Sequence, residues 1–492
     1  MSSIGYAALI TSLGLNVVHP LRPAGVNSGV NRRTETNTRI LFPRGVSITD
    51  TPLGHLEFAL RHEDLDLAIA AEALDKIPAD DLIAAYQASP TGEYIRKLCA
   101  LWEWLHDAPL PTDLRTAGRY LPLLDADAYV TSRSPSRNQK YRIEINLPGN
   151  RFFCPVIKKS PRSAADDTDS LLAEISAAMD SADPALYERA VRYLYLSETK
   201  SSFSIEKDIP DSRREDRFIR LLMRAGDKAL ISEEWLVELQ NAVVKDDFSK
   251  EASYRTRQNW LENAAGRVTF FPAPLAGLRE TMHGLAAFAN HADIDLISKA
   301  ACTSFGFVYA HPFMDGNGRL HRFLIHQVLA QSGQIPEGLI VPVSAVILKN
   351  IPDYLKILSG FSAPVTDLWE YRRGDLEPLI VEAPEPYAYR FFDATRETNF
   401  LRSMIEQAIR IEMPAEIRYL SAYDQAMSRI TGEFDIPHKD ASMLVRSIMS
   451  NGSLSKGRRK QFDRLPEAVL DRIEAISIEE AAAPWGGPAA RQ

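Results

Sequence analysis

The chain has 492 residues, of which 45% are hydrophobic and 25% are charged. These values are ordinary for globular proteins, so they exclude a wholly disordered chain and a fibrous repeat, and the length predicts two to three domains. The net charge of −8 means that the surface as a whole repels nucleic acid and anionic membranes, so binding of either kind requires a local basic patch.

The cysteine content and the absence of long apolar runs indicate the cellular compartment. Cys99, Cys154 and Cys302 are widely separated and odd in number, which argues against a disulfide framework. The sequence has no run of about 18 apolar residues, and no Lys or Arg precedes the apolar stretch near its start. We therefore predict a cytoplasmic protein with no membrane partner.

Residues 1–165 are predicted to form a mixed α and β module. Residues 1–60 are rich in Gly, Pro, Asn and Thr, which predicts loops with short extended pieces. Apolar residues recur every three or four positions from His62 to His106, which predicts helices. Alternation from Tyr141 to Leu147, followed by a Pro-Gly turn and the apolar residues 152–157, predicts a β-hairpin.

Residues 166–385 are predicted to form a second, helical domain after a polar linker at 158–169. An extended run at 267–271, preceded by a glycine, predicts a small β-hairpin inserted among the helices. Helical periodicity predicts the helices themselves at 171–179, 184–206, 211–225, 232–243, 274–290, 293–311 and 318–333.

Residues 386–492 are predicted to form a third, helical module, with an Ala-, Pro- and Gly-rich tail from Ala481 that we expect to be disordered. Helices at 422–430 and 439–449, with a basic hairpin at 453–460, could form a winged helix-turn-helix that binds DNA through residues 422–460. The alternative is a helical packing or dimerisation module with one solvated basic loop.

The residues of the segment 311–322, His-Pro-Phe-Met-Asp-Gly-Asn-Gly-Arg-Leu-His-Arg, are those required for chemistry on phosphates. Pro312 ends the preceding helix, so the Gly-rich loop lies at the N-terminus of the next helix, where free N–H groups and the positive dipole end attract anions. Arg319 and Arg322 lie three apart on the first turn, where a cation is unfavourable unless an external anion such as a polyphosphate is bound.

Two further residues of the segment complete a catalytic set. Asp315 offers a carboxylate for the Mg²⁺ that accompanies nucleotide phosphates. Neutral His311 can take a proton from an attacking hydroxyl. Together with the anion site and the arginines, these residues predict phosphoryl or nucleotidyl transfer.

The same segment resembles the signature of the Fic family, H-P-F-x-D/E-G-N-G-R-x-x-R, at every fixed position. The resemblance covers about residues 185–360 and implies a mainly helical Fic core, with the catalytic loop at 311–322 and a target-binding β-hairpin flap within 255–272. It also implies a protein adenylyltransferase, which transfers AMP from ATP to a Ser, Thr or Tyr hydroxyl of a target protein and releases pyrophosphate. The target protein itself does not follow from the sequence.

The resemblance assigns a role to each matching residue. His311 would be the general base and Asp315 the Mg²⁺ ligand, and the Asn317 side chain would contact the α-phosphate. The residues that would bind phosphate are Gly316, Asn317, Gly318, Arg319 and Arg322. Gly318 stands where the kinase branch of the family has Lys, which favours nucleotidyl transfer.

A second stretch resembles the inhibitory motif of the family, S/T-x-x-x-E-G/N. Ser202 and Glu206 occupy its fixed positions, and residues i and i+4 share a helix face. In the family this Glu pairs with the second arginine of the signature, here Arg322, and blocks the γ-phosphate position. The resemblance therefore implies a self-inhibited enzyme whose inhibitory helix, at about 185–207, precedes the core. Lys207 departs from the usual Gly or Asn.

Several alternatives stay open. The same site could remove AMP or transfer another nucleotide. A regulator that binds DNA through its C-terminal module, with a core that only senses nucleotide, belongs to a different class. A homo-oligomer is a further option, because the family often buries inhibitory helices at subunit contacts.

Overall fold

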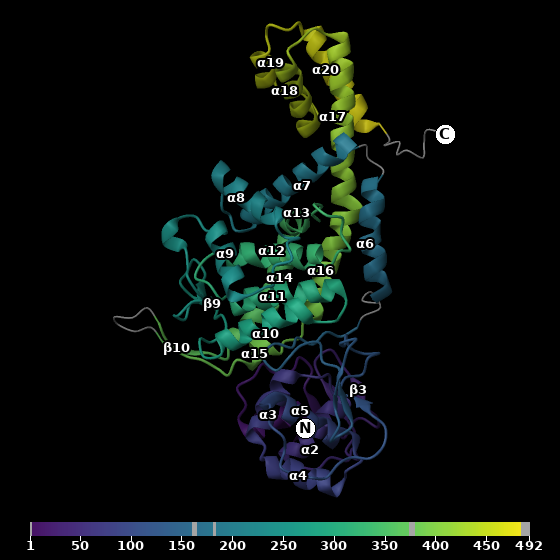
Figure 1. Ribbon diagram of the computed structural model, residues 1–492, viewed down its shortest axis with the longest axis vertical. Coiled ribbons are helices and arrows are strands. Elements are labelled where there is room, and N and C mark those ends of the chain that lie inside the picture. The colour runs from purple at the N-terminus through teal and green to yellow at the C-terminus, as the bar shows by residue number, and fades with distance from the viewer. Residues whose placement is uncertain (1, 160–164, 181–183, 373–378, 484–492) are drawn as a thin grey trace. The chain divides into compact units, whose positions relative to one another are not determined.

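The computed structural model describes residues 2–159, 165–180, 184–372 and 379–483 (Figure 1). The described chain is mainly helical, which confirms the predicted fold class. It divides into two compact units, of which the first contains residues 1–168, 216–332 and 350–402 and the second contains residues 169–215, 333–349 and 403–492. The predicted linker and the predicted disordered tail lie partly outside the described residues.

The N-terminal part of the first unit is a helical cluster with two small sheets. One sheet has the order β1-β2-β4-β3 and the other β5-β7-β6. The helices are α1 (Tyr6–Leu13), α2 (Pro52–His62), α3 (Leu67–Lys76), α4 (Ala79–Ala88) and α5 (Glu93–His106). The strands are β1 (Ser2–Ser3), β2 (Ala24–Val26), β3 (Thr34–Glu35), β4 (Ile40–Phe42), β5 (Leu121–Pro122), β6 (Ser136–Asn138) and β7 (Ile143–Ile145).

The prediction of loops over residues 1–60 was wrong at two places, where α1 and α2 form. α1 ends at Gly14, which adopts the left-handed conformation that favours glycine (φ 57°). α2 begins after Thr51, whose side chain accepts a hydrogen bond from the N–H of Gly54, and Pro52 suits the first helical position. Both helices are short, so their apolar periodicity is too brief to stand out in a Gly- and Pro-rich stretch.

The predicted hairpin between 141–147 and 152–157 was also wrong. β7 pairs with β6 and β5 instead. The second segment bonds to residues far along the chain, with Cys154 N–H donating to Arg390 O at 2.8 Å and Val156 N–H to Phe392 O at 2.9 Å. Alternating apolar residues show that a segment is extended, but they do not show which segment it pairs with.

The remainder of the first unit is a helical core around α11. Nearly every residue of α11 is buried. α11 packs against α10 and α12. Gly284 of α10 and Gly306 of α11 admit Phe152 and Phe153, since a Cβ at Gly306 would lie 2.4 Å from the Phe153 ring. The helices of this core are α8 (Ser212–Met223), α9 (Glu233–Val243), α10 (Leu278–His291), α11 (Leu296–Ala310), α12 (Asn317–Gln331), α14 (Ile351–Thr366), α15 (Tyr387–Arg390) and α16 (Thr395–Gln407).

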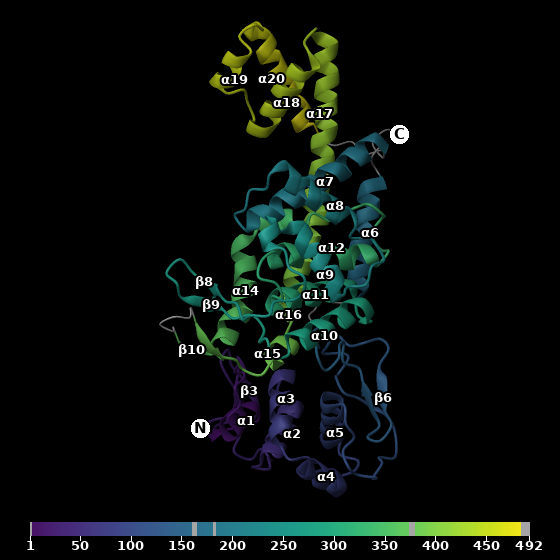
Figure 2. The ribbon, with the colours of Figure 1, turned by 60° about the vertical axis from the view of Figure 1, so that its left-hand side comes forward.

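Two β-hairpins lie side by side at one edge of this core (Figure 2). The first, β8 (Leu261–Glu262) with β9 (Val268–Phe270), confirms the predicted hairpin at 267–271. The second is β10 (Glu370–Arg372) with β11 (Ile380–Glu382). Val268, Trp369 and Leu379 share a small apolar cluster, which joins the two hairpins.

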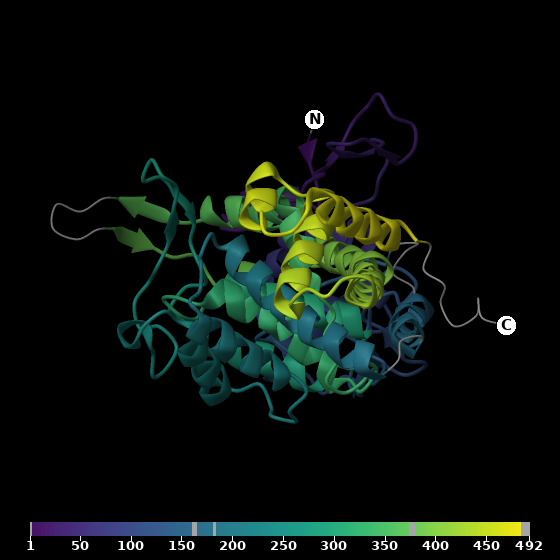
Figure 3. The same ribbon diagram turned by 90° about the horizontal axis from the view of Figure 1, so that it is seen from above.

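The second unit contains α6 (Ala165–Asp180), α7 (Pro184–Ile205), α13 (Val343–Lys349) and a C-terminal bundle of α17 (Met413–Glu433), α18 (His438–Asn451), α19 (Lys456–Gln461) and α20 (Glu467–Ala482). The bundle has its own apolar core, built from residues of its helices and the turns between them. Figure 3 shows these four helices in yellow-green and yellow. No helix among the described residues is long and apolar enough to span a membrane.

The predicted basic hairpin at 453–460 was wrong, because this stretch forms α19. The side chain of Ser455 accepts a hydrogen bond from the N–H of Arg458 and so starts the helix. Leu454 is buried in the bundle core just before this cap. The bundle therefore has no wing in its described residues, and α17 continues through Gly432.

Candidate functional site

The predicted catalytic loop joins the end of α11 to the start of α12. His311 follows the last residue of α11 and has a left-handed backbone, with φ 49° and ψ 59°, which is uncommon outside glycine. Its N–H donates to Phe307 O at 2.9 Å, so the helix closes on this residue. This conformation costs about 1 kcal/mol for an L-residue, so the surrounding structure must hold it.

Arg255 stabilises this conformation by hydrogen bonds to the loop backbone. Its backbone N–H donates to Pro312 O at 2.8 Å, and its Nε donates to His311 O at 3.0 Å. The guanidinium also donates to Ala273 O. Arg255 is buried, and desolvation lowers its pKa to about 10. A cation at the C-terminal end of α11 is favoured by the helix dipole.

A pair of hydrogen bonds closes the loop on itself. Phe313 N–H donates to Asn317 Oδ1 at 3.1 Å, and Asn317 Nδ2 donates back to Phe313 O at 2.7 Å. The Phe313 ring is fully buried beside Tyr254. The structure therefore places the buried Asn317 amide on the loop backbone, and its predicted contact with the α-phosphate stays a prediction.

The N-terminus of α12 is open to an anion. Its N-cap is Gly316, with φ 88°, and no side chain caps the helix or places an acid in its first turn. Leu320 donates the first bond to Gly316 O at 3.0 Å, so the N–H groups of Asn317 and Gly318 lie outside the helical ladder. Free N–H groups at the positive end of the helix dipole form a phosphate site.

Asp315 lies at the rim of this site. Its side chain is 49% exposed, and its Oδ1 accepts from Gly316 N–H at 2.6 Å and from Arg319 at 3.3 Å. Among the described residues, no three His, Cys, Asp or Glu side chains gather as a metal site. Mg²⁺ bound with a nucleotide takes one or two carboxylates plus phosphate oxygens, so the exposed Asp315 carboxylate beside an anion site fits that ion.

Both arginines of the segment are buried. Arg319 is 4% exposed and Arg322 is 2% exposed. Arg319 donates to Val243 O at 2.7 Å, which is a carbonyl at the C-terminal end of α9, as well as to Asp315. These two contacts join the guanidinium to the end of α9 and to the loop.

The imidazole of His311 is neutral at physiological pH. Desolvation lowers its pKa to about 4, the Arg255 cation acts in the same direction, and Val308 O and Asp315 oppose the shift. Nδ1 lies 3.3 Å from Val308 O, so we assign its proton to that contact. The lone pair of Nε2 is then available to accept a proton.

Sequence reasoning missed Arg255 and Glu251. Glu251 accepts a hydrogen bond from Met314 N–H at 2.7 Å, and desolvation raises its pKa. Both residues act on the loop from about 60 positions away and belong to no motif. Only the tertiary contacts identify them.

Ser202 and Glu206, the predicted inhibitory residues, lie at the C-terminal end of α7 in the second unit. Ser202 is fully buried. Lys207 N–H donates to Ser204 O at 2.9 Å, and Asp208 N–H donates to Phe203 O at 3.1 Å. These two bonds form a Schellman cap, in which Lys207 takes the left-handed position (φ 57°). Gly and Asn favour that position, which explains why the motif usually has them after the Glu.

The segment that contains this loop matches a known protein family. Residues 230–329, which contain α9, α10, α11, the whole β8–β9 hairpin and all but the last two residues of α12, match the family model described as Fic/DOC family. No curated protein matches the chain.

Two solved structures resemble the chain. One is a Fic family protein from Desulfovibrio desulfuricans G20, which is 16% identical, with 63% of this chain and 87% of that chain covered and a TM-score of 0.38. The other is a Fic domain containing signaling protein from Bacteroides thetaiotaomicron VPI-5482, which is 19% identical, with 51% of this chain and 97% of that chain covered and a TM-score of 0.38.

Proposed function

Because this chain is a Fic-domain protein, with the domain matched at residues 230–329, we propose that it transfers AMP from ATP to a Ser, Thr or Tyr hydroxyl of a target protein. One observation carries the proposal. A neutral His311 and the uncapped N-terminus of α12 are held a few residues apart, in a loop closed by the Phe313–Asn317 pair. The loop thus offers a proton acceptor next to a site for phosphate.

The transfer needs two changes at the α-phosphorus. The target hydroxyl gives its proton to Nε2 of His311, and its oxygen attacks the α-phosphorus. The bond from that phosphorus to the β-phosphate oxygen breaks, so pyrophosphate leaves and AMP stays on the target as a phosphodiester. Positioning and charge neutralisation supply most of the rate enhancement in such reactions.

The other residues of the loop would bind the polyphosphate. The free N–H groups of Asn317 and Gly318 would receive the α-phosphate charge, with Gly316 as the N-cap that shapes this site, and Arg319 and Arg322 would hold the β- and γ-phosphates. Mg²⁺ would be held by Asp315 and, when bound, neutralises phosphate charge. Buried arginines are suited to this role because a guanidinium stays charged and forms paired bonds to phosphate oxygens.

We further propose that Glu206 inhibits the enzyme by pairing with Arg322. The inhibitory motif carries this proposal, and the Schellman cap supports it, because the cap fixes the backbone of α7 on both sides of Glu206. A carboxylate next to Arg322 competes with the γ-phosphate for the same cation.

The test uses ATP labelled either on the α-phosphate or on the γ-phosphate, incubated with the purified chain, a cell lysate and Mg²⁺. We expect only the α-label to exceed the level found in the lysate without the chain, and this excess should rise at least tenfold in Glu206→Gly and disappear in His311→Ala. Lys207→Ala is the matched control, since it changes the adjacent position, leaves the strain of the cap as it is and removes no carboxylate, and it should leave incorporation unchanged.

Three outcomes would contradict these proposals. Incorporation of the γ-label above the level of the lysate alone, lost in His311→Ala, indicates phosphoryl transfer by this chain. The absence of label in every variant rules out AMP transfer from ATP. Equal incorporation by the wild-type chain and by Glu206→Gly overturns the inhibitory role alone.

A further inference from the structure

Positive and negative charges are unevenly distributed in the C-terminal bundle, which the net charge of the whole chain does not reveal. Residues 413–483 contain ten Lys and Arg and eleven Asp and Glu, so the bundle is almost neutral. Residues 438–461, which span α18 and α19, contain six Lys and Arg and a single acid, Asp440. Asp440 is paired with Arg464. The bundle therefore has a basic side, although the chain as a whole has a net charge of −8.

Many of the acids of the bundle are engaged elsewhere. Arg459 bonds to Glu467, Asp471 and Glu474 of α20, so these three carboxylates are paired within the bundle. Arg429 and Arg472 pair with further acids of α17 and α20.

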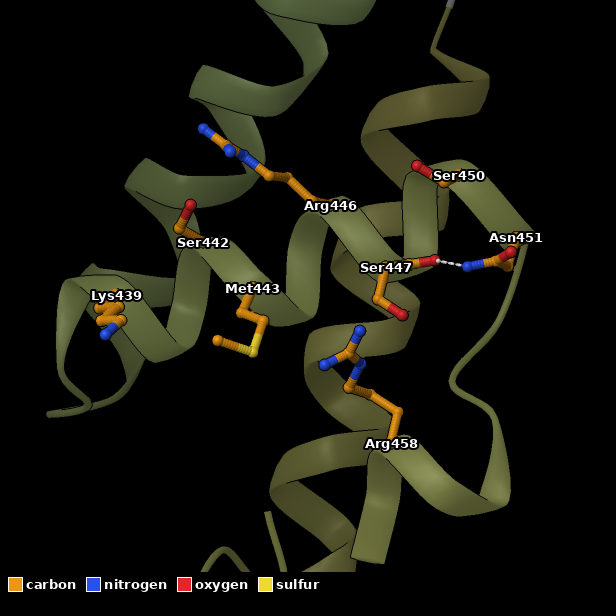
Figure 4. A pocket seen from close by; sticks show the side chains of 8 residues that line it. All are labelled: Lys439, Ser442, Met443, Arg446, Ser447, Ser450, Asn451 and Arg458. Atoms are coloured by element: carbon orange, nitrogen blue, oxygen red, sulfur yellow. Dashed lines mark hydrogen bonds between the residues drawn. The ribbon is translucent and has the colours of Figure 1, made fainter. Parts of the chain in front are cut away.

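Three cations line a hollow between α18 and α19. The hollow has a volume of about 440 Å³, and its lining contains Lys439, Arg446 and Arg458, with serines, one Asn, one Met and no carboxylate. In Figure 4, Arg458 rises from α19 toward Ser447 of α18. Among the described residues, no carboxylate pairs with any of the three cations. Cations, hydroxyls and amides are the groups that contact phosphate oxygens in nucleic-acid complexes.

Two of the three cations, Arg446 and Arg458, are held in place by neighbouring side chains. The guanidinium of Arg446 lies 5.6 Å from the centre of the Tyr423 ring, and the Tyr423 hydroxyl donates to Ser442 at 2.7 Å. Arg458 donates to Gln461 at 2.7 Å. Cations that are already ordered lose less conformational entropy when they bind phosphate.

The backbone has the form of a helix-turn-helix in which α18 is the second helix, because residues 434–437 join it to α17. α18 is 14 residues long, and the turn 452–455 then leads into α19, with Gly452 in the left-handed conformation (φ 73°). The opposite side of α18, at Leu444, Val445 and Ile448, is fixed in the bundle core. This arrangement presents one face of a rigid helix of about 21 Å, which is the element that enters a major groove.

We propose that the α18–α19 face binds double-stranded DNA through its phosphate backbone. The lining of the hollow contains no aromatic side chain on which unpaired bases could stack, which argues against single strands. The major groove of an RNA duplex is too narrow for a helix, which argues against double-stranded RNA. This inference does not depend on the proposed AMP transfer.

The test measures binding of the full chain to a fluorescent duplex of about 30 bp by anisotropy, at a series of salt concentrations. We expect the affinity to fall steeply with salt, by a slope of about −0.9 per phosphate contacted. The triple variant Lys439→Gln, Arg446→Gln, Arg458→Gln should bind at least tenfold more weakly and with a slope smaller by about two to three. Arg418→Gln, which removes an exposed cation of α17, is the matched control and should stay within twofold of wild type.

Circular dichroism of each variant confirms that the bundle is folded. The proposal is overturned if the chain does not bind the duplex at low salt, or if the triple variant binds as well as wild type. It is also overturned if saturating ATP displaces the duplex, which would place the contact at the catalytic loop. Binding of heparin but not of DNA would overturn it in favour of a different polyanion.

Discussion

At the scale of single residues, the left-handed backbone at two positions has consequences that can be tested. Arg255 stabilises this conformation at His311, and Lys207 adopts it itself. The Arg255 guanidinium donates to carbonyl oxygens and to no carboxylate among the described residues, and these bonds hold His311 in its left-handed conformation. Lys207 itself adopts a similar conformation, in the cap at the end of α7. Arg255 therefore supports the geometry of the catalytic loop, and the backbone of Lys207 is strained.

Replacing Arg255 tests its role in positioning His311. Arg255→Met should lower the free energy of unfolding by about 2 to 3 kcal/mol, because several buried carbonyls lose a charged donor. It should also lower kcat for AMP transfer at least tenfold with little change in KM for ATP, since the Arg255 side chain bonds to His311 and Ala273 and not to the phosphate-binding residues of the loop. Steady-state kinetics measures both constants. A fall in kcat no larger than that of Arg220→Met, an exposed arginine of α8, would contradict the positioning role.

Replacing Lys207 tests the strain at the end of α7. Lys207→Gly should raise the free energy of unfolding by about 1 kcal/mol, because glycine adopts the left-handed position without a Cβ conflict. Urea unfolding followed by circular dichroism measures the change. Lys207→Ala keeps the Cβ and should be close to neutral, so equal effects of the two substitutions would rule out backbone strain as the cause.

At the scale of elements, the start of α12 is the feature on which the site depends. Gly316 is its N-cap, with φ 88°, and a Cβ there would lie 3.1 Å from Val243 of α9. The same helix is followed by Gly333, with φ 71° and open space around it. Both ends require glycine for backbone reasons, but only the first end lies in the candidate site.

These two glycines provide a matched pair of variants. Gly316→Ala and Gly333→Ala should each destabilise the chain by about 1 to 2 kcal/mol, because each puts an L-residue in the left-handed region. Only Gly316→Ala should weaken ATP binding, since it displaces the N–H groups of the phosphate site. Isothermal titration calorimetry with Mg²⁺ and ATP measures the affinities. Equal affinities in the two variants would show that ATP does not bind at this end of α12.

At the scale of the whole molecule, the chain consists of two compact units, and the unit with the catalytic loop buries a carboxyl group. This group is Glu397, which accepts a hydrogen bond from the Tyr309 hydroxyl at 2.8 Å. Desolvation raises the pKa of Glu397 to about 7. The carboxyl is thus protonated in the folded state at a pH where an unfolded Glu is ionised.

Glu397 should make this unit less stable as the pH rises. Between an unfolded pKa of about 4.3 and the folded value, the folded state binds the extra proton, so the free energy of unfolding declines across that window and levels off above it. Glu397→Gln should remove up to about 3 kcal/mol of the decline, at about 1.4 kcal/mol per pKa unit. Urea unfolding at pH values of about 5 and about 7.5 measures the difference between the variant and the wild type, and a decline of the same size in both would contradict a raised pKa. The low pKa of His311 acts in the opposite direction in both proteins and cancels in the comparison.

The sequence by itself determined the features that depend on neighbouring residues. The catalytic loop is contiguous from His311 to Arg322, so its chemistry and its family resemblance could be recognised before any contact was known, and the family match over 230–329 confirms the resemblance. The helices of the core have long apolar repeats, and α9, α11 and α12 begin and end within three residues of the predicted bounds.

Only the tertiary structure decided the features that depend on contacts between distant residues. Arg255 supports the loop from 56 positions away, and the 152–157 segment bonds to residues 390–394 and not to the nearby strand. The basic stretch at 453–460 became a helix because Leu454 is buried and Ser455 caps the start of α19. Local sequence patterns report propensity and periodicity, whereas the partner of a buried group depends on where the rest of the chain packs.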